Sequence, residues 1–220
     1  MLYNIFWRWN RLAENSYKTV EFEASDEFVE KRSRFIGYCK PVTTEEEALE
    51  FINKIKTKHW DARHNVYAYC LRNGQIKRYS DDGEPQGTAG MPTLDVLVKS
   101  NLTDLVVVVT RYFGGVLLGA GGLVRAYSHS AKIAVEASHI ITMQECLVCT
   151  LVCDYNQYGK VSSLIPQYNG VIDDSSFGTD VEISFHISQD NLDKLKKQLA
   201  DATCGVVEPK EEFKDFFVME

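Results

Sequence analysis

The chain has 220 residues, of which 45% are hydrophobic and 25% charged, the composition of an ordinary globular protein. Its formal net charge of −7 argues against broad, non-specific binding to nucleic acid. Its longest apolar run is far shorter than the roughly 20 residues that a membrane-spanning helix needs. We therefore expect a cytoplasmic protein that does not cross a membrane.

Charge is unevenly distributed along the chain. Residues 1–140 hold 18 Lys and Arg against 17 Asp and Glu, whereas residues 141–220 hold 6 against 14. This difference favours two domains, expected at 17–140 and 141–220, and only the first is suited to face a polyanion. The aromatic residues 1–16 lack the basic segment of a signal peptide, so we expect an N-terminal extension there.

The predicted elements of the first half alternate between strands and helices. Thr43 and Thr44 precede three glutamates, which predicts a capped helix, and Asn73-Gly74 is a strong hairpin signal. In chain order we expect strands at 17–23 and 30–39, a helix at 44–58, the hairpin, a helix at 92–99, a strand at 104–111 and a helix at 121–138.

The second half reads as the β-α-β-β-α-β order of a ferredoxin-like unit. We expect strands at 145–154, 170–174 and 180–187, a first helix carrying Val161, Leu164 and Ile165, a second helix capped by Asp190, and a last strand beginning at Gly205. The boundary between the domains is expected at 139–144.

The six cysteines are Cys39, Cys70, Cys146, Cys149, Cys153 and Cys204. Three of them lie in "ECLVCTLVCDY", which reads as a buried strand. Cys146 and Cys149 would then point to opposite faces, and no second pair has metal-site spacing. Buried, reduced thiols are therefore expected rather than a metal cluster.

The stretch "TRYFGGVLLGAGGLVRAYSHS", residues 110–130, follows an apolar strand and places two glycine clusters before a helix. It lacks the lysine of a Walker A loop and the third glycine of the dinucleotide fingerprint. The unpaired first amides of the helix predict an anion site, used for a phosphate of nucleic acid. The residues expected at this site are Arg111, Gly114, Gly115, Gly119, Gly121, Gly122, Arg125 and His129. Alternatively, the glycines serve only tight turns and close helix packing.

The loop "SDDGEPQGTAGMP", residues 80–92, holds three carboxylates, which either make turns or form a ligand or partner site. We expect this acidic loop to lie beside the glycine loop, with Asp81 or Asp82 paired to Arg111 or Arg125. The supporting residues expected here are Arg63, His64, Asp81, Asp82 and Glu84.

Three further groups of residues could carry chemistry. "KHWDARHN" places His59, Asp61, Arg63 and His64 together, but a metal would need another ligand, and Asp61 or Arg63 fixing the hairpin start is the favoured interpretation. Ser128-His129 lacks the Gly-x-Ser-x-Gly elbow of a hydrolase. Arg125, His129 and Lys132 form a basic stripe that faces a phosphate backbone, an acidic partner or solvent. We expect no catalytic residue, metal or other cofactor.

Four motifs in order, "EKRSRFIGY", "WDARHNVYAY", "SDDGEPQGTAGMP" and "VVVVTRYFGGVLLGAGGLVRAY", resemble the YigZ/IMPACT family, in particular an uncharacterised bacterial branch. The resemblance covers about residues 17–138 and, more loosely, 141–220. It implies an α+β protein whose first domain is like the second domain of small-subunit ribosomal protein five. Its second domain would be like the ferredoxin-like fifth domain of elongation factor G.

The resemblance implies a binding protein associated with nucleic acid or the ribosome, with a role in regulating translation. Eukaryotic relatives act in translational control through an additional domain that this sequence does not show. An enzyme, such as a peptidase or other hydrolase, and a binder of small phosphorylated ligands remain as alternatives. The expected partners are RNA, the ribosome or a translation-related protein, and the sequence does not specify the oligomeric state.

Overall fold

The computed structural model describes residues 16–218, so the extension expected at 1–16 lies almost wholly outside the described residues. The chain divides into two compact units, residues 17–142 and the segment from residue 143 onward. Among the described residues, no helix is both long and apolar enough to cross a membrane.

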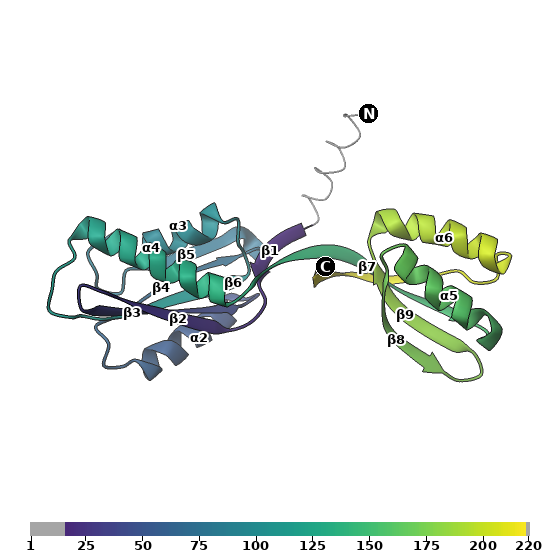
Figure 1. Cartoon of the computed structure of the whole chain (residues 1–220), viewed down its shortest axis with the longest axis horizontal. Coiled ribbons are helices and arrows are strands. Elements are labelled where there is room, and N and C mark those ends of the chain that lie inside the picture. Colours follow the sequence, from purple (N-terminus) through teal and green to yellow (C-terminus); the bar gives the residue numbers. More distant parts are fainter. Residues whose placement is uncertain (1–15, 219–220) are drawn as a thin grey trace, which may run out of the picture. The chain divides into compact units, whose positions relative to one another are not determined.

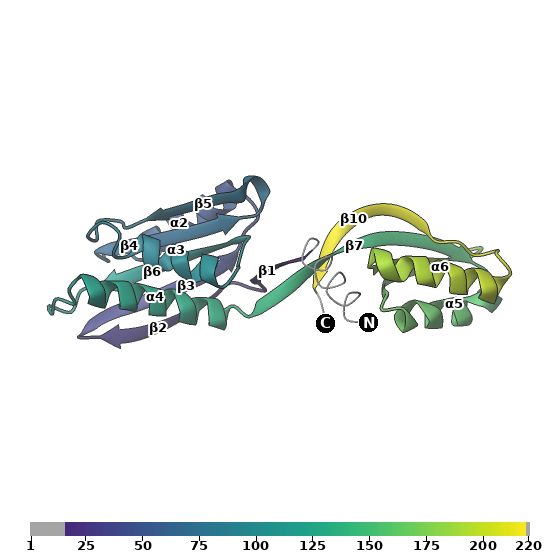
Figure 2. The same cartoon turned by 90° about the horizontal axis from the view of Figure 1, so that it is seen from above.

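The first unit contains a five-stranded antiparallel sheet in the order β2-β3-β6-β4-β5. The strands are β2 (Ala24–Glu30), β3 (Ser33–Pro41), β4 (His64–Leu71), β5 (Ile76–Ser80) and β6 (Leu105–Tyr112); β1 (Ser16–Val20) precedes them. Helices α3 (Gly90–Lys99) and α4 (Ala120–Ala137) cover one face of this sheet, and α2 (Glu45–Lys58) covers the other (Figures 1 and 2). The unit is therefore a three-layer sandwich.

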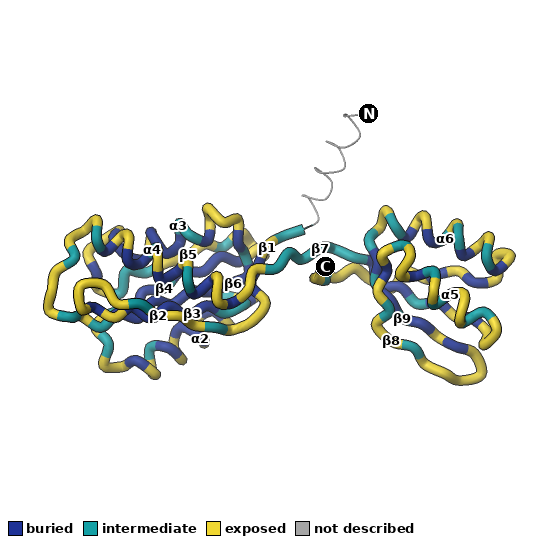
Figure 3. Tube along the Cα trace, in the orientation of Figure 1, coloured by how far each residue is buried: buried dark blue, intermediate teal, exposed yellow. Residues whose placement is uncertain are grey.

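The central strand β6 explains why both faces need helices. Its residues 105–111 are all buried. Val107 and Val109 belong to the core beneath α3 and α4, whereas Val106 and Val108 belong to the core beneath α2. Alternate side chains of a strand point to opposite faces, so an unbroken apolar run predicts a strand covered on both sides. Figure 3 shows the resulting buried band along the strands.

The start of α2 confirms the predicted cap. The Thr44 side chain accepts a hydrogen bond from the Glu47 amide at 3.2 Å, and the Glu47 carboxylate accepts one from the Thr44 amide at 3.4 Å. This reciprocal pair satisfies amides that the helix itself leaves free.

Close packing of α4 on the sheet depends on a glycine outside the glycine loop. A Cβ at Gly37, in β3, would lie 2.4 Å from the carbonyl oxygen of Ser130 and 2.8 Å from the Cβ of Ala134, both in α4. No side chain fits that space, so the backbones of strand and helix meet directly at this point.

Two predicted features of the first half were wrong in detail. The two strands expected at 17–23 and 30–39 are three, because β2 forms a hairpin with β3. β2 is a mostly exposed edge strand without clear apolar alternation, and its turn uses Lys31 and Arg32 at positive φ, residues that carry no turn signal. The predicted two-residue turn at Asn73-Gly74 is a longer, 3₁₀ turn, Asn73–Gln75, in which Gln75 also has positive φ.

The second unit has the β-α-β-β-α-β order that the sequence predicts. Its elements are β7 (Ile140–Cys153), α5 (Tyr155–Gln167), β8 (Val171–Phe177), β9 (Val181–Ile187), α6 (Gln189–Thr203) and β10 (Lys210–Val218). Strands β10, β7, β9 and β8 lie in that order and are antiparallel to one another, which is the arrangement of the ferredoxin-like fold; β1 also pairs with β7. The expected α+β class is thus confirmed.

Two local predictions for this unit need correction. The N-cap of α6 is Ser188, and Asp190 lies inside its first turn. The last strand begins at Lys210, because Cys204 and Gly205 adopt positive φ and end the helix first. The division into units after Thr142 falls within the range 139–144, and most of that range belongs to β7, which begins at Ile140.

The cysteine-rich segment is a strand, as predicted. Cys149 and Cys153 belong to the core of the second unit, and Cys146 is half-buried. Burial raises the pKa of the Cys149 thiol to about 11, which favours the protonated form. All six cysteines are free thiols.

Candidate functional site

A cleft of about 340 Å³ opens in the first unit, between the acidic loop and the glycine loop. Its lining comes from the start of β4, the acidic loop, the end of β6 and the start of α4: Arg63, His64, Glu84, Pro85, Arg111, Phe113, Leu117, Leu118, Gly119, Ala120 and Leu123. The expectation that the two loops gather at one rim of the sheet is thus met. The polar residues concentrate on the floor, whereas most of the remaining wall is apolar.

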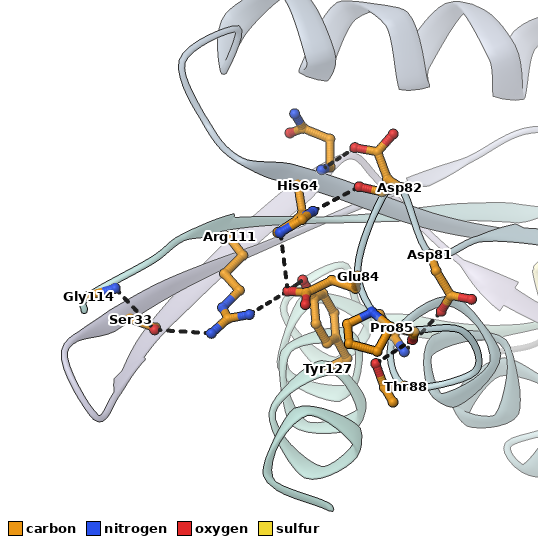
Figure 4. A network of polar contacts seen from close by, with 12 residues as sticks. Ser33, His64, Asp81, Asp82, Glu84, Pro85, Thr88, Arg111, Gly114 and Tyr127 are labelled. Carbon is orange, nitrogen blue, oxygen red and sulfur yellow. Dashed lines mark hydrogen bonds and ion pairs between the residues drawn. The ribbon is translucent and has the colours of Figure 1, made fainter. Parts of the chain in front are cut away.

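The floor of the cleft is a buried ion pair that the sequence did not predict. Glu84, and neither Asp81 nor Asp82, pairs with Arg111: the Arg111 guanidinium donates from Nη1 to Glu84 Oε1, and both side chains are at most 6% exposed (Figure 4). The other terminal nitrogen of Arg111 lies 3.4 Å from the hydroxyl of Ser33. Ser33 also accepts from the amide of Gly114 at 3.2 Å, which ties the glycine loop to the hairpin of β3.

Tyr127 completes this network from α4. Its ring is fully buried and its hydroxyl donates to Glu84 Oε1 at 2.8 Å. Burial and the nearby Glu84 carboxylate raise the pKa of Tyr127, so the hydroxyl keeps its proton and donates it in the hydrogen bond. Tyr127 is not among the site residues that the sequence predicts. The available signal was a tyrosine on the apolar side of a helix, because a buried tyrosine hydroxyl needs a partner.

Asp81 and Asp82 organise backbone instead of pairing with arginine, which corrects the predicted contacts. Asp81 accepts hydrogen bonds from the amides of Gly87, Ala89 and Gly90, and so caps the start of α3. Asp82 accepts from the amide of Asn65 at 2.7 Å, and its other oxygen binds Lys56 at 2.8 Å. These contacts fix the shape of the loop that presents Glu84.

His64 stands beside the ion pair. Its Nδ1 lies 2.8 Å from the carbonyl oxygen of Asp82, and its Nε2 lies 3.8 Å from Glu84 Oε1. His59, four positions before Arg63, belongs to a different network: its ring nitrogens contact the hydroxyls of Tyr38 and Tyr112 at 2.6 and 2.9 Å. The cluster "KHWDARHN" is therefore split between two places.

The predicted glycines have distinct roles. Gly115 and Gly119 adopt positive φ, and Gly119 is the N-cap of α4, without a side-chain cap. A Cβ at Gly114 would lie 2.0 Å from the backbone of Arg32, so that position needs glycine. Gly121 and Gly122 lie in the first turn of the helix. The helix starts at Ala120, one residue earlier than predicted.

The basic stripe on α4 is exposed but lies outside the lining of the cleft. Arg125, His129 and Lys132 are all exposed. His129 packs edge-on against Phe28 of β2, with ring centroids 4.6 Å apart, and Lys132 lies 3.7 Å from Glu136. Of the predicted anion-binding side chains, only Arg111 lines the cleft, and Glu84 neutralises it. Arg63 supplies an exposed positive charge at the rim.

Comparison with known proteins matches both units. Residues 31–135 match the family model described as the Impact N-terminal domain, and residues 151–205 match a domain of unknown function, DUF1949. The chain is 37% identical to IMPACT family member YvyE of Bacillus subtilis over 198 residues, covering 90% of this chain and 91% of the relative. The chain belongs to the IMPACT family.

Other IMPACT proteins show how far the similarity extends. IMPACT family member YigZ of Escherichia coli is 34% identical over 80% of this chain and 87% of its own length. The IMPACT homologue of Dictyostelium discoideum is 34% identical over 56% of this chain and 35% of its own length. A crystal structure of a hypothetical protein, 30% identical, matches with a TM-score of 0.57 over 90% of this chain and 98% of that one. The family predicted from the four motifs is confirmed.

Proposed function

We propose that this protein binds single-stranded RNA in the cytoplasm and acts in the regulation of translation, with an RNA phosphate held at the start of α4. One observation carries the proposal: the uncapped start of an 18-residue helix and an exposed arginine border the same cleft. The link to translation, and to the ribosome or a translation-related protein as partner, rests on the family resemblance.

The start of α4 suits an anion for two reasons. The first amides of a helix have no partner within it, and Gly119, which has no side chain, leaves them uncapped. The helix dipole places partial positive charge at the same end. Gly119 and Ala120 line the cleft, so this end faces the space where a ligand would lie.

The charges around the cleft favour the same ligand. Arg111 cancels the negative charge of Glu84, so the floor does not repel a phosphate. Arg63 has no ion-pair partner within residues 16–218 and is free to contact a phosphate. The exposed stripe of Arg125, His129 and Lys132 continues along α4 and offers further contacts to a nucleic-acid backbone.

Cleft size supports a second candidate. A volume of about 340 Å³ lies at the small end of the range for small-molecule sites and accommodates about one nucleotide. A free phosphorylated small molecule would therefore fit the same cleft, and the length dependence of binding separates the two cases. RNA binding requires that affinity rises from a mononucleotide to a hexanucleotide, as further phosphates reach the stripe.

The test is a salt titration of affinity for a single-stranded RNA hexamer, measured by fluorescence anisotropy. Arg63→Glu should weaken binding and reduce the salt slope by about 0.7 for the lost phosphate contact. Arg125→Glu should also weaken RNA binding, because it replaces a positive charge of the exposed stripe on α4 with a negative one. Lys77→Glu is the matched control. Lys77 lies opposite Cys70 in the register of β5 and β4, at the end of β4 that is far from His64. Equal effects of Arg63→Glu and Lys77→Glu would refute the proposed phosphate position.

A further inference from the structure

We infer that the cleft recognises the amino group of an unpaired nucleobase, through two hydrogen-bond acceptors on its floor that the protein leaves unused. The inference rests on the proposed function and specifies its ligand: cytosine, adenine or guanine in preference to uracil. The two acceptors are Glu84 Oε2 and His64 Nε2.

The first acceptor is the second oxygen of the buried carboxylate. Arg111 and Tyr127 both donate to Glu84 Oε1, and no donor within the described residues reaches Oε2. Within the described residues, the fully enclosed side-chain atoms that lack a hydrogen-bond partner are Arg111 Nε and Ser130 Oγ. Glu84 Oε2 lacks a partner too, but it is not fully enclosed. It is therefore accessible, and Glu84 lines the cleft. The Glu84 side chain is only 4% exposed, so little water reaches this oxygen, and a ligand that donates a hydrogen bond there gains affinity.

The second acceptor follows from the hydrogen bond at the other side of the imidazole ring. His64 Nδ1 lies 2.8 Å from the carbonyl oxygen of Asp82, which can only accept, so Nδ1 carries the proton. In the neutral ring Nε2 then has a lone pair. Its 3.8 Å separation from Glu84 Oε1 is too long for a hydrogen bond, and Nε2 has no other partner within residues 16–218.

A ligand group with two N–H bonds can donate to both of these neighbouring acceptors, and the surrounding charges favour a neutral group over a charged one. Arg63 and the positive end of α4 would repel an ammonium group, whereas both would attract a phosphate. A neutral amino group joined to a phosphate is a nucleotide whose base carries an exocyclic amine. Uracil has none and presents carbonyl oxygens, which these acceptors repel.

The walls of the cleft fit the faces of a base. Phe113 lines it and is 38% exposed as a residue, and Pro85 and Leu117 add apolar surface. Proteins read single-stranded RNA by stacking its bases on such side chains while polar groups bind the Watson–Crick edge. A base pair would already use its amino group, and the cleft holds about one nucleotide, so the base must be unpaired.

The test compares cytidine and uridine hexamers, which share length, charge and sugar but differ at the amino or carbonyl group of the base. The full-length chain should bind the cytidine hexamer about tenfold more tightly. Glu84→Gln keeps an oxygen for Arg111 and Tyr127 but places an NH₂ donor at Oε2, so the preference should disappear or reverse. Glu50→Gln, an exposed position on α2, is the matched control and should keep the preference.

His64→Asn provides a second variant if Glu84→Gln does not fold by circular dichroism. Asparagine can still donate to the Asp82 carbonyl but lacks Nε2, so the cytidine preference should fall while uridine affinity stays unchanged. Salt-dependent binding of both hexamers with equal affinity would overturn this inference and leave the proposed function intact. Absence of binding to either hexamer would overturn both. Binding of tetralysine that Glu84→Gln abolishes would identify a cation site and also overturn it.

Discussion

Replacing Tyr127 with phenylalanine should destabilise the first unit by about 2 kcal/mol, the contribution expected of a hydrogen bond to a charged acceptor. The ring is fully buried, so phenylalanine fills the same space, and the change removes only the hydroxyl that donates to Glu84 at 2.8 Å. Glu84 keeps Arg111 as its partner, which limits the loss to one hydrogen bond.

Native-state hydrogen exchange measures this loss within the unit itself. The amides of Val106–Val109 in β6 lie in the fully buried centre of the sheet and should exchange only when the unit opens globally. A loss of about 2 kcal/mol accelerates their exchange roughly 30-fold. Tyr79→Phe is the control, because Tyr79 is 43% exposed and its hydroxyl has no hydrogen-bond partner within the described residues. If Tyr127→Phe changes the rates no more than Tyr79→Phe, the network does not stabilise the fold.

Three further predictions concern the fold. Gly37→Ala should lower the free energy of unfolding, measured thermally or with denaturant, by several kcal/mol, because the new Cβ would lie 2.4 Å from a carbonyl oxygen of α4. Gly159→Ala in α5, where the new Cβ meets open space, should instead raise it by about 0.5–1 kcal/mol. Asp81→Ala should lower the free energy of unfolding by about 1–2 kcal/mol through loss of the α3 cap. A fall smaller than about 0.5 kcal/mol, the level of an ordinary surface substitution, would show that solvent replaces the cap. Iodoacetamide at pH 8 should modify exposed Cys204 well before Cys39, whose pKa burial raises to about 12, and mass spectrometry showing equal rates would contradict the packing of β3.

The sequence predicted the elements whose local patterns agree with their tertiary surroundings. The apolar run of β6 and the cap of α2 are of this kind, and so is the regular order of the second unit. β2 was missed because an exposed edge strand needs no apolar periodicity, and its pairing with β3 supplies the stabilisation. The turn between β2 and β3 has residues at positive φ but contains neither glycine nor asparagine, the residues that usually indicate such a turn.

For the candidate site, the sequence predicted which loops would meet but not which side chains would pair. Asp81, Asp82 and Glu84 are three carboxylates within four positions, and only the backbone path of the loop decides that Glu84 turns inward to Arg111. The role of Tyr127 depends on that choice, because its hydroxyl needs the buried carboxylate. Such pairings join residues far apart in sequence and leave no local pattern.

The direct contact between Gly37 and α4 limits how far the helix can move when the proposed RNA ligand binds. Backbone against backbone leaves no soft side chain to compress, so α4 cannot slide or sink relative to β3 without separating from it. The amides at the start of the helix are therefore held at a fixed depth before any ligand arrives. The entropy lost in the proposed RNA binding should then come mainly from ordering the segment between Tyr112 and Ala120.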